Sequence, residues 1–192
     1  MAKRILVAYD TVDGSTAELA EFVGKELSKE GNVVDVRRVS EVTDVNSYQA
    51  VVVGCPVIIE KWTEDALDFL NRHKQALSQR PVALFYTCLA TLGRTLEEGL
   101  GGVMTNYVSP LLVQFPDLKP VSVGIFTGVL DYTKYTEEGA EGIRRFMRAR
   151  GCPVEGRNDY RDWQVISNWA KDVGAKLETS TGGWTITATG QR

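Results

Sequence analysis

The chain has 192 residues, of which 43% are hydrophobic and 24% charged, and its net charge is −3. This composition is typical of a globular protein with a substantial core, and the slightly acidic balance argues against nucleic acid as a partner. No apolar stretch is long enough to cross a bilayer and none resembles a signal peptide, so we expect a cytoplasmic protein.

Short apolar segments rich in β-branched and aromatic residues alternate with amphipathic segments of helical period along most of the chain. Strands that are apolar throughout are typical of a parallel sheet covered by helices on both faces. Right-handed crossovers then favour an α/β doubly wound, five-stranded parallel sheet with the order 2-1-3-4-5. In chain order, we expect a strand at Arg4–Tyr9, a helix at Ser15–Lys29, strands at Val33–Arg38 and 50–54, a helix at 64–77, strands at 81–87 and 121–127, and a helix at 162–177.

The segment 93–120 fits this alternation less well. It contains Gly99, Gly101 and Gly102, which predict a broken helix, and a short helix is expected at 109–115.

Two further segments lie outside the five-stranded pattern. The connection 133–161 is long and contains a basic amphipathic stretch, 137–150, that is expected to form a helix. The polar tail 179–192 has one strand-like stretch, 184–188. We expect residues 1–178 to form a single domain and the tail to lie outside it.

The chain offers few candidates for side-chain chemistry. The cysteines Cys55, Cys88 and Cys152 are an odd number without the spacing of a metal site, and they fit reduced thiols. The single histidine, His73, lies in a polar helical stretch and is expected at the surface. We therefore expect no metal site and no catalytic side chain.

The turn 11–16, Thr-Val-Asp-Gly-Ser-Thr, lies between the first strand and the first helix. A helix start offers unpaired N–H groups and a positive dipole end, which together favour a bound anion. Gly14 lets the backbone come close, and Thr11, Ser15 and Thr16 carry hydroxyl groups. The turn contains no Lys or Arg, so dipoles would have to hold the anion. The turn therefore predicts a phosphate-bearing cofactor.

Ligands of doubly wound sheets bind at the carboxyl ends of the strands. This rule selects four loops, at 10–16, 55–62, 87–92 and 127–132. A flat heteroaromatic ring could lie between the second and third of them.

These loops resemble known motifs. Thr-x-Asp-Gly-x-Thr at 11–16 resembles the FMN phosphate loop of flavodoxins, and Gly54-Cys55-Pro56-Val57 followed by Lys61-Trp62 is similar to the second FMN loop of the flavodoxin-domain family. The stretches 128–132 and 160–163, and the insertion at about 133–160, resemble the branch that includes the menaquinone-dependent protoporphyrinogen IX dehydrogenases.

The resemblance implies a flavodoxin-like fold with bound FMN. It implies phosphate contacts from one loop, ring and ribityl contacts from two more, and a fourth loop that flanks the open side of the ring. The expected cofactor-binding residues are Asp10, Thr11, Val12, Asp13, Gly14, Ser15, Thr16, Pro56, Val57, Ile58, Trp62, Thr87, Cys88, Leu89, Ala90, Gly128, Leu130 and Asp131.

Two acidic residues depart from the family pattern. Position 10 usually carries a hydroxyl group in the family but is Asp10 here. At ~5 Å its carboxylate would repel a phosphate charge by roughly 3 kcal/mol, unless it points away or is neutralised. Glu60 lies in the second loop, where its charge would lower the reduction potential of the flavin.

Three functions remain open from the sequence. The first is an FMN-dependent oxidoreductase that exchanges electrons with a quinone or porphyrinogen-like molecule. The second is a flavodoxin-type electron carrier with a protein redox partner, and the third is a flavin-free binding or regulatory module. Peripheral membrane contact through the basic helix 137–150 and a homodimer are further expectations.

Overall fold

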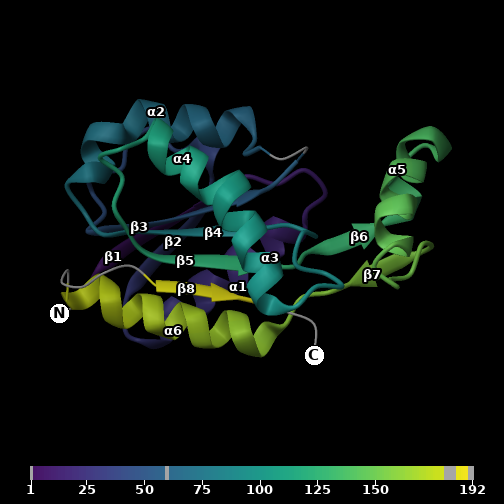
Figure 1. Ribbon diagram of the computed structural model, residues 1–192. Helices are drawn as coiled ribbons and strands as arrows, with labels where there is room; N and C mark the ends of the chain where they lie inside the picture. The colour runs from purple at the N-terminus through teal and green to yellow at the C-terminus, as the bar shows by residue number, and fades with distance from the viewer. Residues whose placement is uncertain (1, 59–60, 180–184, 190–192) are drawn as a thin grey trace.

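The computed structural model describes residues 2–58, 61–179 and 185–189. Within these residues the central sheet has six strands, all parallel, and Figure 1 shows helices on both of its faces. The strand order is β2-β1-β3-β4-β5-β8. The strands are β1 (Arg4–Tyr9), β2 (Val33–Arg38), β3 (Ala50–Pro56), β4 (Val82–Thr87), β5 (Pro120–Phe126) and β8 (Thr185–Ala188).

The order of the first five strands confirms the sequence prediction, but the expected strand number is wrong. The sixth strand, β8, comes from the tail that we expected to lie outside the domain, and it pairs in parallel with β5. Thr189 continues this pairing, because its N–H donates to the carbonyl of Ile125 and its hydroxyl accepts from the N–H of Thr127. Tail residues thus cover the edge of the sheet that five strands would leave open.

Alternate residues along each strand face opposite layers of helices. Ile5 and Val7 pack toward α1 (Ser15–Lys29) and α6 (Trp163–Thr179), whereas Leu6 and Ala8 pack toward the opposite face. That opposite face is covered by α2 (Glu64–Ser78), α3 (Leu96–Val103) and α4 (Ser109–Gln114) (Figure 1).

The glycine-rich segment does not form the broken helix that we expected. A π-helical turn, η2 (Met104–Val108), joins α3 to α4, and the junction residues Met104 and Ser109 keep right-handed helical backbone angles. A capping box between Thr95 and Glu98 starts the helix. Buried Val103, Val108 and Leu111 then hold it against the sheet, so tertiary packing offsets the cost of the glycines.

The segment after β5 builds a separate small module. The strands β6 (Val129–Asp131) and β7 (Arg157–Asp159) pair antiparallel, and α5 (Glu137–Arg148) projects from the main body (Figure 1). We refer to residues 129–160 as the α5 module. Its residues Leu130, Tyr132, Ala140, Met147 and Cys152 form a small hydrophobic cluster with Leu92 from the loop after β4.

Gly54 in β3 makes room for a buried ring. A Cβ atom at this position would lie 1.8 Å from Cζ of Phe85, which packs edge-on against Trp169. We therefore expect Gly54→Ala to lower the free energy of unfolding by roughly 1–3 kcal/mol, measured by urea denaturation.

The matched control for this prediction is Gly101→Ala in α3, where a Cβ atom would meet nothing within 4 Å. That variant should gain about 0.5–1 kcal/mol from helix propensity. Equal urea midpoints for Gly54→Ala and Gly101→Ala would contradict the packing argument.

Candidate functional site

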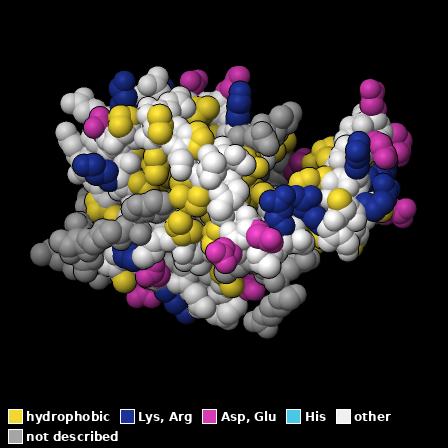
Figure 2. All heavy atoms as spheres, viewed as in Figure 1, with side chains coloured by type: hydrophobic (Ala, Val, Ile, Leu, Met, Phe, Trp, Pro, Cys, Tyr) yellow, Lys and Arg dark blue, Asp and Glu magenta, His cyan; other side chains and the backbone are white. Residues whose placement is uncertain are grey.

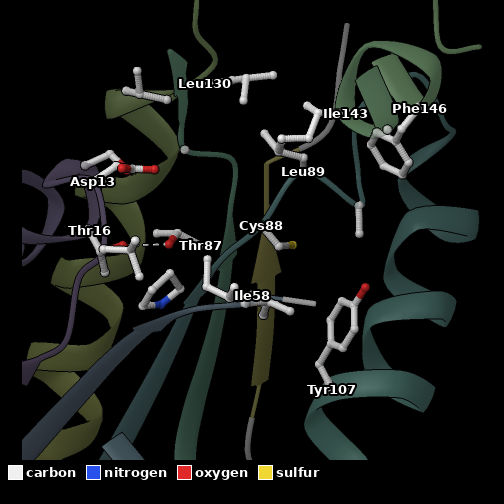
Figure 3. A pocket seen from close by; sticks show the side chains of 18 of the residues that line it. Asp13, Thr16, Ile58, Thr87, Cys88, Leu89, Tyr107, Leu130, Ile143 and Phe146 are labelled. Carbon is white, nitrogen blue, oxygen red and sulfur yellow. Dashed lines mark hydrogen bonds between the residues drawn. The ribbon is translucent and has the colours of Figure 1, made fainter. Parts of the chain in front are cut away.

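A cavity of about 740 Å³ lies at the carboxyl ends of the central strands. The loops that follow β1, β3, β4 and β5 line one side of it, and residues of α3, η2 and α5 line the other. Figure 3 shows Asp13 and Thr16 on one side, with Tyr107 and Phe146 across the opening. The cavity therefore lies between the strand-end loops and a second wall formed by α3, η2 and α5.

The start of α1 has the features of an anion cradle. Gly14 precedes the helix with φ +94°, a left-handed conformation, and no side chain caps the first turn. The N–H of Gly14 donates to Oγ1 of Thr11 at 3.0 Å, which closes the turn. The first N–H groups of α1 are therefore available to a ligand beside Ser15 and Thr16, which line the cavity.

Two sets of contacts hold this turn in place. The hydroxyl groups of Thr16 and Thr87 lie 2.8 Å apart in a buried hydrogen bond between α1 and the end of β4 (Figure 3). From the α5 module, Lys134 Nζ donates to the carbonyl of Asp13 at 2.7 Å, and the Tyr135 hydroxyl donates to the Asp13 carboxylate at 3.4 Å. The α5 module thus contacts the turn 11–16 directly.

The charge of Asp10 is neutralised by Arg38. Nε and Nη2 of Arg38 donate to Asp10 Oδ1 at 3.1 and 3.0 Å, and Nη2 also donates to the carbonyl of Thr11 at 3.2 Å. Asp10 is 3% exposed and does not line the cavity. The repulsion that we expected from the sequence is therefore offset by a guanidinium that the sequence places far away, in β2.

The middle of the cavity is apolar. Ile58, Leu89 and Ile143 line it together with Cys88. Burial raises the pKa of the Cys88 thiol to about 11, so near neutral pH this group is an uncharged thiol. Such walls suit a flat apolar ring.

Cys55, at the end of β3, lies outside the cavity lining. Burial raises the pKa of its thiol to about 12, and the N–H of Thr63 donates to its sulfur at 3.4 Å. Neither Cys55 nor Cys88 has the lowered pKa of a reactive cysteine.

Most of the residues expected from the sequence line this cavity. They are Val12, Asp13, Ser15, Thr16, Pro56, Val57, Ile58, Thr87, Cys88, Leu89, Ala90, Gly128 and Leu130.

The other expected residues lie elsewhere. Asp10, Thr11 and Gly14 shape the turn beside the cavity. Trp62 is buried, edge-on to Tyr86 at 5.1 Å between ring centroids, because its large apolar surface packs into the core beneath α2. The Asp131 carboxylate accepts from Thr133 and starts a short 3₁₀ turn, and that hydrogen bond lowers its pKa. Glu60 lies outside the described residues.

Sequence reasoning missed the second wall of the cavity. Gly99 and Gly102 line it from α3, and Gly139 and Gly142 line it from α5. Residues three apart share one face of a helix. The Cβ positions of Gly102 and Gly142 are open, whereas Gly99 packs closely on Thr91 and Gly139 on Thr136. This repeated spacing was the available signal. Val129 lies in the expected loop 127–132, and the other missed lining residues are Arg94, Asn106, Tyr107, Tyr135, Ile143, Phe146 and Arg150.

The pairing of Asp10 with Arg38 can be tested by stability. Arg38→Gln leaves a buried carboxylate without its partner and should lower the free energy of unfolding by roughly 1–2 kcal/mol, a moderate value because Arg38 is partly exposed. Adding Asp10→Asn should recover most of that loss in thermal or urea denaturation.

Arg37→Gln serves as the control, because Arg37 is an exposed arginine on the same strand. Its effect should stay within about 0.5 kcal/mol. If the double variant were no more stable than Arg38→Gln alone, the pairing would have no energetic role.

Comparisons with known proteins agree with this geometry. The chain is 24% identical over 174 residues to a protoporphyrinogen IX dehydrogenase (quinone) of Escherichia coli (strain K12), which covers 88% of this chain and 94% of that protein. A protein of the same name from Leishmania major is 25% identical over 183 residues, or 90% of this chain and 75% of that protein.

A solved structure shares the fold. Oxidised flavodoxin 1 from Bacillus cereus matches with a TM-score of 0.53 at 12% identity, over 93% of this chain and 99% of that chain.

Among the described residues, no helix is long and apolar enough to span a membrane. The model of the flavodoxin domain matches residues 6–154, and this domain implies FMN as the cofactor, as the sequence predicts. The chain therefore belongs to the flavodoxin-domain family.

Proposed function

We propose that this protein is an FMN-dependent oxidoreductase that exchanges electrons with a quinone or porphyrinogen-like molecule. The observation that carries this proposal is the size and composition of the cavity. It extends from the anion cradle at α1 to a second wall where Ile143 and Phe146 supply apolar surface, so it offers space beyond the cradle for a second molecule. The name of the Escherichia coli and Leishmania relatives supports a quinone as the partner.

The described residues fit FMN. The uncapped start of α1 and the hydroxyl groups of Ser15 and Thr16 supply donors for a phosphate without any basic side chain in the turn. Ile58, Leu89 and Leu130 supply apolar surface for the ring. When bound, FMN supplies the redox chemistry, and the protein contributes binding, orientation and exclusion of water.

One observation favours the electron carrier as a second candidate. Val12 and Ile58 line the cavity but are 61% and 43% exposed, which gives its rim an apolar edge. Such an edge would suit contact with a protein redox partner. Against this, α5 lies across the cavity from the turn 11–16, where a protein partner would have to approach.

The FMN site is tested by flavin fluorescence quenching. Gly14→Ala forces a side chain into a left-handed backbone at a strain of roughly 1–2 kcal/mol, so it should distort the cradle and weaken FMN binding about tenfold. Gly31→Ala is the matched control, because Gly31 has φ +82° at the other end of α1 and an equally open Cβ position.

We expect Gly31→Ala to lose stability but to keep its FMN affinity. Equal FMN affinities for the two variants would show that the start of α1 does not bind the FMN phosphate. No binding of FMN to the unaltered chain at high micromolar concentration would leave the flavin-free module as the remaining function.

The enzyme and the carrier are distinguished by reoxidation kinetics. The FMN-loaded protein is reduced with dithionite and mixed in a stopped-flow instrument with 2-methyl-1,4-naphthoquinone. We expect a rapid reoxidation rate that saturates as the quinone concentration rises, because Ile143 and Phe146 of the second wall would bind the quinone before electron transfer. A rate that stays low and linear in quinone would favour the carrier.

A further inference from the structure

Two arginines line the second wall of the cavity, which residues of α3, η2 and α5 form. Arg94 precedes α3, Arg150 follows α5, and both line the cavity. Figure 3 shows Phe146, on which Arg150 stacks, across the cavity from Asp13 and Thr16. The arginines therefore belong to a different part of the cavity from the anion cradle of α1.

Close backbone packing brings the two arginines together. Gly93 has φ +63°, and a Cβ atom there would lie 2.6 Å from Cβ of Arg150 and 2.8 Å from its carbonyl oxygen. Only glycine allows this approach between the loop after β4 and Arg150, which follows α5. The next residue along the chain is Arg94, so the contact places its charge beside Arg150.

Arg150 is held in position but is not neutralised. Its guanidinium stacks on Phe146, with Cζ 3.5 Å from the ring centroid, and Nη1 donates to the carbonyl of Phe146 at 3.2 Å. Its Nε is buried and has no acceptor among the described residues. Burial lowers the pKa of Arg150, and the positive charge of Arg94 lowers it further. Both effects disfavour the charged form, so a bound anion would stabilise it.

Some of the other arginines of the chain pair with carboxylates. Arg38, Arg144 and Arg161 each pair with a carboxylate at 3.0 Å or less. Among the described residues, neither Arg94 nor Arg150 has such a carboxylate partner. Figure 2 shows basic side chains gathered where the α5 module meets the main body.

The surroundings of the two arginines define the chemistry of an occupant. Ile143 and Phe146 supply apolar surface next to Arg150, and Leu89 faces them in Figure 3. We propose that Arg94 and Arg150 form an anion subsite that binds the carboxylate of an otherwise apolar, aromatic redox partner. The subsite rests on the proposed function, because it assigns one end of that partner while the rest of the cavity holds the flavin.

The test uses a pair of probes of nearly equal shape, one with a charged carboxylate and one with a neutral amide. Naphthalene-2-carboxylate and naphthalene-2-carboxamide are titrated by isothermal calorimetry into the full chain, with and without saturating FMN, at physiological ionic strength. We expect the unaltered protein to bind the carboxylate roughly threefold to tenfold more tightly than the amide, as expected for a charge-assisted hydrogen bond near the surface. The ratio of the two affinities should fall toward one in Arg94→Gln and in Arg150→Gln.

Two further variants control for charge and for location. Arg148→Gln removes one exposed positive charge from α5 outside the cavity and should keep the preference. Gly102→Leu adds a side chain to the cavity wall, where a Cβ atom would meet only the Arg94 side chain at 3.9 Å, and should weaken both probes. Arg94 is exposed, so Arg94→Gln is expected to fold even if Arg150→Gln is destabilised.

Several results would overturn the subsite. One is an unchanged preference for the carboxylate in both arginine variants. Another is a loss of that preference in Arg148→Gln as large as in the arginine variants of the cavity. A third is unchanged affinity for both probes in Gly102→Leu. A failure of the proposed function would look different. If FMN did not bind but the preference persisted without it, the subsite would stand and the flavin function would fall.

Discussion

The parallel direction of every strand in the central sheet is the constraint on which the site depends. Because β1, β3, β4 and β5 all run the same way, the loops that follow them emerge at one edge. The start of α1 lies at that edge with its N–H groups uncapped, and the hydrogen bond between Thr16 and Thr87 ties it to the neighbouring strand ends. Sheet direction thus creates both the anion cradle and the floor of the cavity.

The charges around the cavity follow two opposite patterns. Beside the cradle, Asp10 is paired with Arg38, so the helix start keeps its positive dipole without an opposing carboxylate. Across the cavity, Arg94 and Arg150 lack carboxylate partners among the described residues, and Arg150 is held by Phe146 instead. At one end of the cavity the nearby carboxylate is paired, and at the other end the arginines have no carboxylate partner among the described residues. Such a cavity suits two different ligands, each with its own anionic group.

Local sequence patterns were sufficient for the sheet and for one wall of the site. Apolar runs with helical segments between them predicted the first five strands in order, and the rule for parallel sheets selected the loops that line the cavity. Trp62 and Asp131 lie elsewhere, because a loop position does not reveal whether a side chain packs inward or caps its own turn. The glycines of α3 predicted a broken helix, but burial of Val103 and Leu111 outweighs their low propensity.

The sequence by itself determined the layered α/β fold, the family and the cradle at 11–16, because these depend on short-range periodicity and on one strand–turn–helix junction. Tertiary structure alone decided the sixth strand, the pairing of Asp10 with Arg38 and the second wall of the cavity. Each of these joins residues that are far apart in the chain. Their energies come from edge pairing, charge neutralisation and close packing, which depend on distance in space and leave no local pattern in the sequence.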